Sequence, residues 1–415
     1  MRDRMDSEVR RPLARYALVL LLAVNLLNYI DRQALYAVFP LLQADLKLSD
    51  TALGFLGSAF MLCYMVAAPF FGRLGDRLNR SRLAAAGLTI WSTATVLSGM
   101  AASYPSLLAA RTLVGVGEAS FGTVSPGLLA EFFPRQRRGM MLSLFFLAIP
   151  VGSALGYVLG GQLGQAFGWQ KAFFIVGLPG LLLALPLFFL TDPRHTDQPV
   201  DAAPHEKMVS LLNGFYANSC YVRTTLSMTA MTFALGGLAQ WAPTFLHRSF
   251  GLEVARGNTL FGAITVVAGI IGTLAGGWLG DRFSRRTPAG HLYVAAAGFL
   301  LGTPVLLLAL TTSYLKTCLA AIFLAELFLF LNTGPLNTML VNVVTPERRA
   351  MGFAVNIFVI HALGDAISPA IIGAISDRAG LPAALLVTPL AVLVAAGFSV
   401  AGGRSALRDQ QECNI

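Results

Sequence analysis

The stretch LLNYIDRQALYAVFP, from Leu26 to Pro40, places an acid and a base side by side within a long run of apolar residues. A membrane helix needs roughly 20 mainly apolar residues, and this run is long enough to be one. Charged side chains inside a bilayer are costly, and where they occur they commonly serve a function. Asp31 would lie roughly 14 Å along the helix from Pro40. Asp31 and Arg32 therefore predict a polar site inside the membrane.

The composition of the whole chain agrees with a protein that crosses a membrane many times. Of its 415 residues, 55% are hydrophobic and 12% are charged, and the mean hydropathy is +0.66. A soluble domain carries about 25% charged residues. The net charge of +9 comes from short basic clusters between apolar runs. That pattern is typical of cytoplasmic loops and argues against a nucleic-acid partner. The four cysteines are scattered and show no disulfide or metal-ligand spacing.

Twelve apolar runs are candidate spans, which predicts an all-α membrane protein. Most arginines and lysines fall in connections on one side of the membrane, so both termini are expected in the cytoplasm. The basic N-terminus leads directly into the first span, which we interpret as retained rather than as a cleaved signal. The expected spans are 15–42, 51–72, 83–103, 105–133, 139–166, 169–190, 222–247, 256–280, 290–312, 315–344, 351–376 and 381–403.

The spans form two similar sets of six. The longest polar stretch is a predicted cytoplasmic linker at 191–221, between an N-terminal bundle at 1–190 and a C-terminal bundle at 222–415. The motif GRLGDRLNR at 72–80 returns as GWLGDRFSRR at 277–286. Two pseudo-symmetric six-helix bundles are typical of transporters with a substrate site between the halves near mid-membrane.

The two G-x-L-G-D-R loops predict a cytoplasmic gate. Their glycines permit close helix approach, and the aspartate can sit at the N-terminus of a neighbouring helix. The arginines can pair across the seam between the halves. A simpler alternative is a tight turn that carries the charges that set topology. The expected gate residues are Gly72, Asp76, Arg77, Arg80, Glu131, Asp281 and Arg282.

The fourth expected span carries RTLVGVGEAS, with Arg111 and Glu118 roughly 9 Å and 20 Å from its outer end. These two residues are seven apart and share one helix face. Asp31 and Arg32 point about 100° apart around their helix and are poorly placed to pair with each other. Two acids and two bases at overlapping depth therefore predict a neutral cluster between the first and fourth spans.

The functional interpretation of this cluster is a proton and substrate site. Glu118 is the first choice for the titrating acid, with Asp31 and Arg111 also in the proton-coupling set. Arg32, Arg111 and Glu118 are the expected substrate contacts in this half. The alternative is a static network of salt bridges that pins two helices together.

The second half has no matching acid–base pair at the equivalent position, where Gly236 and Gly237 stand. It is expected to form an apolar wall with hydrogen-bonding points. His361 and Asp365 are spaced i,i+4 and could bond, and Glu326 is either a buried functional acid or a group facing water in the cavity. The expected substrate contacts in this half are Gln240, Trp241, Asn332, Asn356 and His361.

The chain resembles the major facilitator superfamily over nearly its whole length, through its two halves, its linker and GRLGDRLNR. Within that superfamily it looks most like the spinster family of lipid transporters. The matching stretches are LNYIDR (27–32), YMVAAPFFGRLGDRLNR (64–80), RTLVGVGEASFGTVSPGLLAEFF (111–133), LAIPVGSALGY (147–157) and, more loosely, HALGDAISPAIIGAISD (361–377).

The resemblance implies alternating access and proton-coupled transport of sphingolipids or lysophospholipids, with Asp31, Arg32, Arg111 and Glu118 matching the family's charged cluster. We expect no metal and no cofactor, with the proton gradient as the energy source. The expected partners are the lipid bilayer, protons and an amphipathic small molecule, and the protein is expected to be a monomer. Short loops are typical of a bacterial protein, which would lie in the cell inner membrane.

Other functions have weaker support in the sequence. A proton-coupled symporter of organic anions such as sugar acids shares the NYxDR and GxGEA stretches, but it would need cations from both halves, and the second half has no arginine or lysine in the middle of an expected span. An exporter of drugs or other amphipaths is a further alternative. Gate motifs in both halves argue against a channel. An enzyme is not expected because the five histidines are dispersed, with no nucleophile–base or metal motif.

Overall fold

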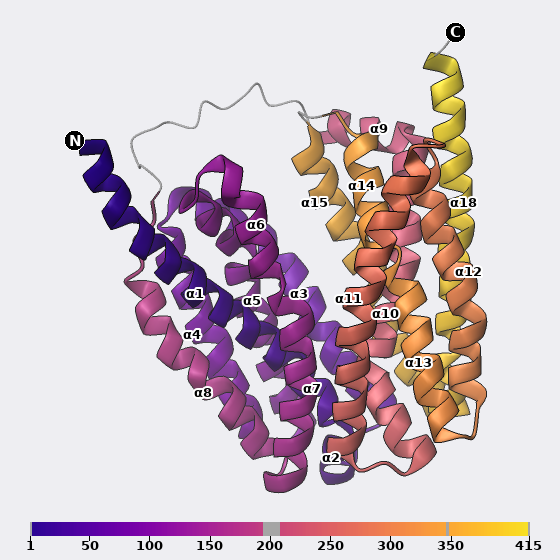
Figure 1. The fold of residues 1–415 in the computed structure, drawn as a ribbon. Helices are drawn as coiled ribbons and strands as arrows, with labels where there is room; N and C mark the ends of the chain where they lie inside the picture. The colour runs from indigo at the N-terminus through magenta and orange to yellow at the C-terminus, as the bar shows by residue number, and fades with distance from the viewer. Residues whose placement is uncertain (1, 194–207, 346–347, 414–415) are drawn as a thin grey trace. The chain divides into compact units, whose positions relative to one another are not determined.

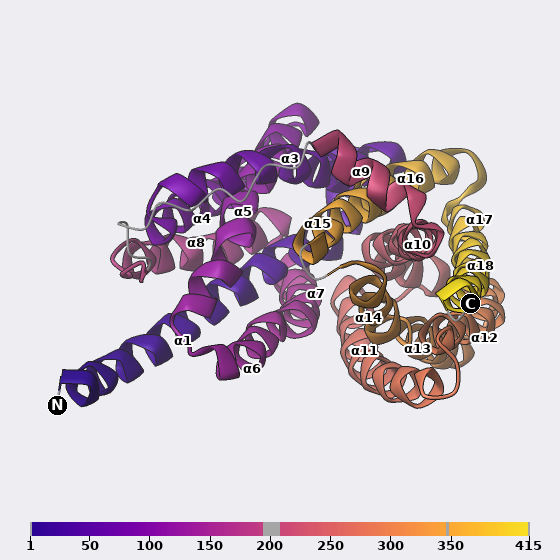
Figure 2. The same ribbon diagram turned by 90° about the horizontal axis from the view of Figure 1, so that it is seen from above.

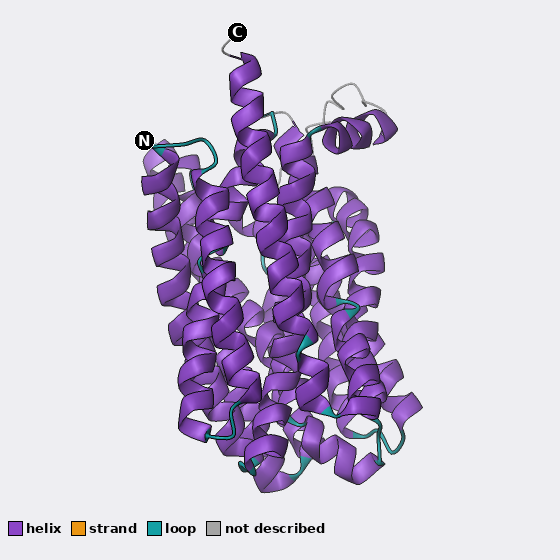
Figure 3. Cartoon of the chain, turned by 90° about the vertical axis from the view of Figure 1, so that its right-hand side faces the viewer, coloured by secondary structure: helices purple, strands orange, loops and turns teal. Residues whose placement is uncertain are grey.

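The computed structural model describes residues 2–193, 208–345 and 348–413, and every regular element in these ranges is a helix (Figures 1 and 3). The first half of the chain contains α1 (Arg2–Ala37), α2 (Phe39–Leu46), α3 (Asp50–Arg77), α4 (Arg80–Gly99), α5 (Tyr104–Glu131), α6 (Arg135–Phe146), α7 (Ala148–Phe167) and α8 (Trp169–Phe188).

The second half begins at the end of the predicted linker, of which residues 194–207 lie outside the described part. It contains α9 (Met208–Ala217), α10 (Ser219–Phe250), α11 (Val254–Ser284), α12 (Gly290–Thr311), α13 (Leu315–Phe330), α14 (Thr333–Val343), α15 (Arg349–Ile360), the π-helical segment η2 (His361–Asp365), α16 (Ser368–Ala379), α17 (Leu381–Leu385) and α18 (Val387–Cys413).

These helices make the twelve predicted membrane spans. Seven spans are single helices, and the other five combine consecutive helices across a break, as α1 does with α2 and α13 with α14. Within the described ranges, nine spans are long and apolar enough to be recognised by length and hydropathy alone. The remaining three, α4, α5 and α10, are richer in Ser, Thr, Gly and charged residues, which lowers their hydropathy.

Polar residues at the loop ends set where several spans begin. The Ser49 hydroxyl accepts a hydrogen bond from the Ala52 N–H at 3.1 Å and so caps α3. Asn79 caps α4 in the same way by accepting from the Arg82 N–H at 3.0 Å. These caps satisfy N–H groups that have no partner inside the helix. The predicted starts at 51 and 83 are therefore close to the observed ones.

Some predicted boundaries differ from the structure. The first helix starts at Arg2, well before the expected start at 15, and the predicted linker contains α9. The first, fifth, tenth, eleventh and twelfth spans were expected to be continuous but are broken. In the eleventh, Gly364 has φ −105° and ψ −105°, which lie outside the helical range. Glycine tolerates such angles because it has no Cβ.

The described helices divide into two compact units. The first comprises α1 to α8 together with residues Leu246–Gly262, and the second comprises the rest of α10 and α11 with α9 and α12 to α18. Residues Leu246–Gly262, which belong to the second half of the sequence, thus group with the helices of the first half. In the second unit, α12 packs against α13 and α18 (Figure 2).

Within the first unit, α5 packs against both α3 and α4, and α1 packs against α7 and α8. Glycines allow α4 and α5 to approach closely. A Cβ on Gly117 would lie 2.6 Å from the Trp91 backbone nitrogen and 2.7 Å from the Gly87 carbonyl oxygen. Any larger residue at 117 would push the helices apart. This close approach brings the hydroxyls of α4 to the charged residues of α5.

Candidate functional site

The first ion pair of the site joins α1 to α5. Arg111 donates from Nη1 to Asp31 Oδ1 at 3.1 Å, and both residues are 2% exposed. Two hydroxyls from α4 complete the arrangement. Thr95 donates to Asp31 Oδ2, and the Ser98 hydroxyl accepts from Arg111 Nε at 2.9 Å and from Nη2 at 2.8 Å. The Phe173 ring centre lies 4.7 Å from the guanidinium carbon. This pair is enclosed and well hydrogen-bonded.

The second ion pair joins the same two helices but has a different environment. Arg32 donates from Nε to Glu118 Oε2 at 2.6 Å. Glu118 is fully buried, whereas the Arg32 side chain is 17% exposed. Three aromatic rings surround the guanidinium, with centres at 5.3 Å for Tyr29, 4.9 Å for Phe60 and 5.1 Å for Tyr64. Rings at this range stabilise a cation through their negative faces.

Each ion pair joins an acid on one helix to a base on the other, so α1 and α5 each contribute one acid and one base. Adjacent residues on α1 point in different directions, and each finds its partner on α5. The cluster is neutral overall, which limits the cost of burying four charges. The neutral cluster predicted from the spacing of Asp31, Arg32, Arg111 and Glu118 is therefore present. The roles assigned to these residues in coupling and binding remain predictions.

The expected gate residues of the first half lie at the opposite end of α3 from Ser49. Arg80 donates from Nη2 to Glu131 at 2.5 Å and to Asp192 at 2.8 Å, and its backbone N–H donates to Asp192 at 2.9 Å. We expected arginines of this loop to pair across the seam between the halves. Arg80 instead pairs inside the first unit, because α5 and the end of α8 place two carboxylates beside it.

The other residues of the predicted gate are more exposed. Asp76 and Arg77 are exposed at the end of α3, and Gly72 is half-buried one turn earlier. In the second unit Asp281 and Arg282 are exposed near the end of α11. The Arg282 guanidinium carbon lies 5.8 Å from the Trp278 ring centre. These positions are accessible at a helix end, as a gate would require.

The second-half candidates are more buried than a cavity wall requires. Gln240 is 1% exposed and Trp241 is fully buried, with its indole N–H donating to the Pro369 carbonyl at 3.2 Å. Asn356 is 1% exposed, and Asn332 donates to the Leu329 carbonyl at 2.5 Å. In this structure Trp241 contributes to packing within its unit and presents no surface to a cavity.

Two other groups of the second unit retain the features expected of a site. His361 Nδ1 lies 2.9 Å from Asp365 Oδ1, so the predicted i,i+4 contact is present, and both side chains are partly exposed. The pair occupies η2, where the helix is distorted. Glu326 is 6% exposed and accepts a hydrogen bond from the Thr265 hydroxyl at 3.0 Å. It is therefore buried, as one of the two sequence interpretations required.

Sequence reasoning missed several residues that hold the site together. Thr95 and Ser98 were not singled out, because hydroxyl residues are common in membrane helices and commonly bond to their own helix. Phe60 and Tyr64 were missed because aromatic residues are frequent throughout the chain. Asp192 follows α8 and reaches Arg80 from 112 positions away, so spacing gave no signal for it.

The fold and the buried charges define the class of protein, which is a membrane transporter built from two six-helix bundles. Residues 21–369 match the family profile of the Major Facilitator Superfamily. The chain belongs to that superfamily and, within it, to the spinster family.

The similarity to spinster proteins extends over most of the chain. Protein spinster homolog 1 of Xenopus laevis is 35% identical, over 93% of this chain and 78% of its own length. The Bos taurus protein of the same name is 38% identical, over 86% of this chain and 71% of its own length. A crystal structure of a bacterial homologue of the human lysosomal transporter spinster, in an inward-facing and unoccupied conformation, has a TM-score of 0.87 at 25% identity. It covers 96% of this chain and 98% of that chain. The predicted family and fold are thus confirmed.

Proposed function

We propose that this spinster-family protein is a proton-coupled transporter of an amphipathic lipid, of the sphingolipid or lysophospholipid type, and works by alternating access. The observation that carries the proposal is the Arg32–Glu118 pair. It joins a fully buried carboxylate to a cation that is 17% exposed and held among three aromatic rings. A negatively charged head group can reach Arg32, whereas it cannot reach the enclosed Asp31–Arg111 pair.

The two ion pairs would then have different tasks. Arg111 is bound by Asp31 and Ser98, and this pair holds α1 against α5. Arg32 has Glu118 as its anionic partner. When a lipid phosphate draws Arg32 away, Glu118 is left as an unpaired carboxylate in an apolar span. That state is costly, and uptake of a proton removes the charge. Head-group binding and proton binding are thereby linked at one residue.

An open apolar pocket along α3, the helix that also carries Phe60 and Tyr64, supports a lipid rather than a small polar anion. It has a volume of about 470 Å³ and lies between α3 and α5. Its α3 residues continue along the helix from Phe60 and Tyr64, which contact Arg32. An acyl chain would be accommodated there while its head group lies at Arg32. The cavity is lined by Leu62, Cys63, Val66, Ala67, Phe70, Phe71 and Val116.

The organic-anion symporter remains the second candidate, because its substrate would also be drawn to Arg32. A small anion such as a sugar acid would be expected to use cations from both halves, and the arginines and lysines of the second half lie near the ends of its helices, as Arg223 and Arg248 do on α10 and Lys316 on α13. For the proposed activity we place the protein in the cell inner membrane as a monomer, with both termini in the cytoplasm.

The test is transport by purified protein in liposomes, with and without a pH gradient, against a panel of lysophospholipids, sphingosine phosphate and sugar acids. The expected result is gradient-dependent movement of at least one lipid, with no movement of sugar acids. Arg32→Ala should abolish the lipid signal in protein that still folds. Transport of sugar acids alone would replace the lipid proposal, and lipid transport that ignores the pH gradient would remove proton coupling.

A further inference from the structure

Residues Leu246–Gly262, which we call the hairpin segment, include the end of α10 and the start of α11 and pack with α1 to α8. Its strongest contact is an ion pair. Arg248 donates from Nη1 to Asp50 Oδ2 at 2.7 Å and from Nη2 to Asp50 Oδ1 at 2.6 Å. It also donates to Gln43 Oε1 at 2.7 Å, and Gln43 donates to Asp50 at 3.0 Å. A two-pronged pair of this kind fixes both distance and direction.

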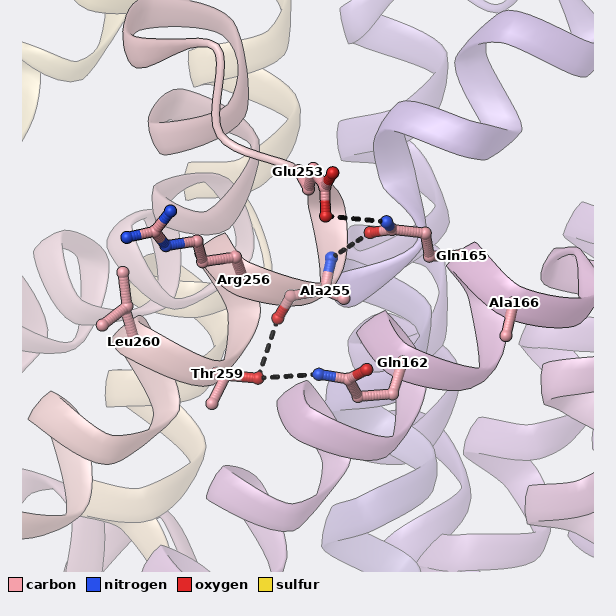
Figure 4. A pocket seen from close by; sticks show the side chains of 8 residues that line it. All are labelled: Gln162, Gln165, Ala166, Glu253, Ala255, Arg256, Thr259 and Leu260. Atoms are coloured by element: carbon pink, nitrogen blue, oxygen red, sulfur yellow. Dashed lines mark hydrogen bonds between the residues drawn. The ribbon is translucent and has the colours of Figure 1, made fainter.

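The other contacts of the hairpin segment satisfy exposed helix ends. Asn258 donates from Nδ2 to the carbonyl of Ala37, the last residue of α1, at 3.0 Å. Gln165 accepts from the Ala255 N–H in the first turn of α11 at 2.8 Å (Figure 4). Gln165 also donates to Glu253 at 3.1 Å. Backbone groups at helix ends have no partner within their helix, so the contacts of Asn258 with Ala37 and of Gln165 with Ala255 supply missing ones.

The packing at this seam is close. A Cβ on Gly161 would lie 2.8 Å from the Asn258 Cβ, so α7 needs a glycine there for Asn258 to fit. Beside the contact lies an open pocket of about 510 Å³, whose lining includes the polar residues Gln162, Gln165 and Thr259 (Figure 4). Water in such a pocket can replace the hydrogen bonds when they separate. The contact between the hairpin segment and α7 is therefore specific in shape, while its hydrogen bonds can be replaced by water when the two separate.

We propose that the Asp50–Arg248 pair is a latch that holds the hairpin segment against α1 to α8, at the end of these helices where α2 lies. The latch opens when the transporter opens on that side. This inference rests on the alternating-access mechanism proposed above. α10 and α11 run from the hairpin segment into the second unit, so release of the segment is coupled to movement of both helices. The two predicted gate motifs lie at the other ends of α3 and α11, so the latch is a separate device.

The test measures the distance between spin labels at Ala44 on α2 and Arg256 on α11, in the full chain with its four native cysteines replaced. Both positions are exposed. Asp50→Asn and Arg248→Gln should each increase the fraction of molecules in which the two labels are far apart. The increase should be about fivefold, as expected for the loss of a partly exposed ion pair. The double variant should resemble either single variant, because both changes break the same contact.

Lys171→Gln is the matched control, since it removes an exposed cation at the same end of the first unit. Its distance distribution should stay as in the unmodified chain. Asp50→Asn could also weaken the first turn of α3, so Arg248→Gln is the decisive variant. An unchanged distribution in Arg248→Gln, or additive effects in the double variant, would overturn the latch. The measurement needs no cargo, so its outcome is independent of whether the lipid proposal holds.

Discussion

Arg111→Ala should destabilise the first unit far more than Arg32→Ala, although both changes remove one arginine from the same cluster. Arg111 is 2% exposed, and its loss leaves Asp31 buried with a hydroxyl partner but no cation. Ser98 also loses two donors. Breaking a buried pair by removing one partner costs about 3–5 kcal/mol. Arg32→Ala also leaves a buried carboxylate, Glu118, without its cation, but the proposed proton uptake by Glu118 would remove that charge, so we expect a smaller loss of about 1–2 kcal/mol.

The same reasoning predicts that removing both charges is better tolerated than removing one. Asp31→Leu combined with Arg111→Met fills similar volume with apolar groups and should lie within about 1 kcal/mol of the unmodified protein. Transport by this double variant is also informative. If Asp31 and Arg111 only hold the helices, transport should persist, whereas its loss would show that they take part in coupling.

Unfolding of purified protein in one detergent, followed by tryptophan fluorescence, is a suitable assay. Trp91 and Trp169 are buried in the first unit and report on its packing. The expected order of unfolding temperature places Arg111→Ala lowest, Arg32→Ala in the middle and the double variant near the unmodified protein. Arg111→Ala that is as stable as the unmodified chain, or a double variant less stable than Arg111→Ala, would refute the reasoning.

Three further predictions concern function. Glu118→Gln should abolish transport driven by a pH gradient while leaving exchange of lipid across liposomes, because Gln cannot gain a proton; normal accumulation with normal pH dependence would exclude Glu118 as the coupling acid. Arg32→Lys should restore little of the transport lost in Arg32→Ala, since lysine lacks the planar fork that holds a phosphate, and full recovery would show that charge alone suffices. Asp76→Asn should favour opening at the end of α3 that carries the gate motif, measured with spin labels on α3 and α15, and an unchanged distance there would leave this loop as a turn.

Much of the fold follows from local sequence, because a bilayer imposes long apolar helices and a repeat reveals two halves. The same local reasoning found the cluster, since residues seven apart share a helix face and adjacent residues do not. It failed where a residue's partner is remote. Arg80 pairs with Asp192, and the hairpin segment packs with helices about 200 positions earlier, as in the Arg248–Asp50 pair.

Burial was harder to predict than spacing. Trp241 was expected to line a substrate path, but its indole N–H finds a backbone carbonyl and the ring is fully buried. A tryptophan with a satisfied N–H packs well inside a bundle, and no pattern in the sequence distinguishes this from a lining position. The distortion at η2 was also missed, because a single glycine in an apolar helix commonly serves packing. Within η2, it is the backbone angles of Gly364 that leave the helical range.

Because both ion pairs run between α1 and α5, one pair could separate during transport while the other still joins the two helices. Both pairs join α1 to α5, so separating Arg32 from Glu118 leaves Asp31 and Arg111 to keep the helices together. If each ion pair instead formed within one helix, Asp31 with Arg32 and Arg111 with Glu118, no ion pair would tie α1 to α5. The cluster can therefore exchange its partners at one pair without loosening the bundle. Under the proposed function, a head group bound at Arg32 would therefore leave the Asp31–Arg111 tie between α1 and α5 in place.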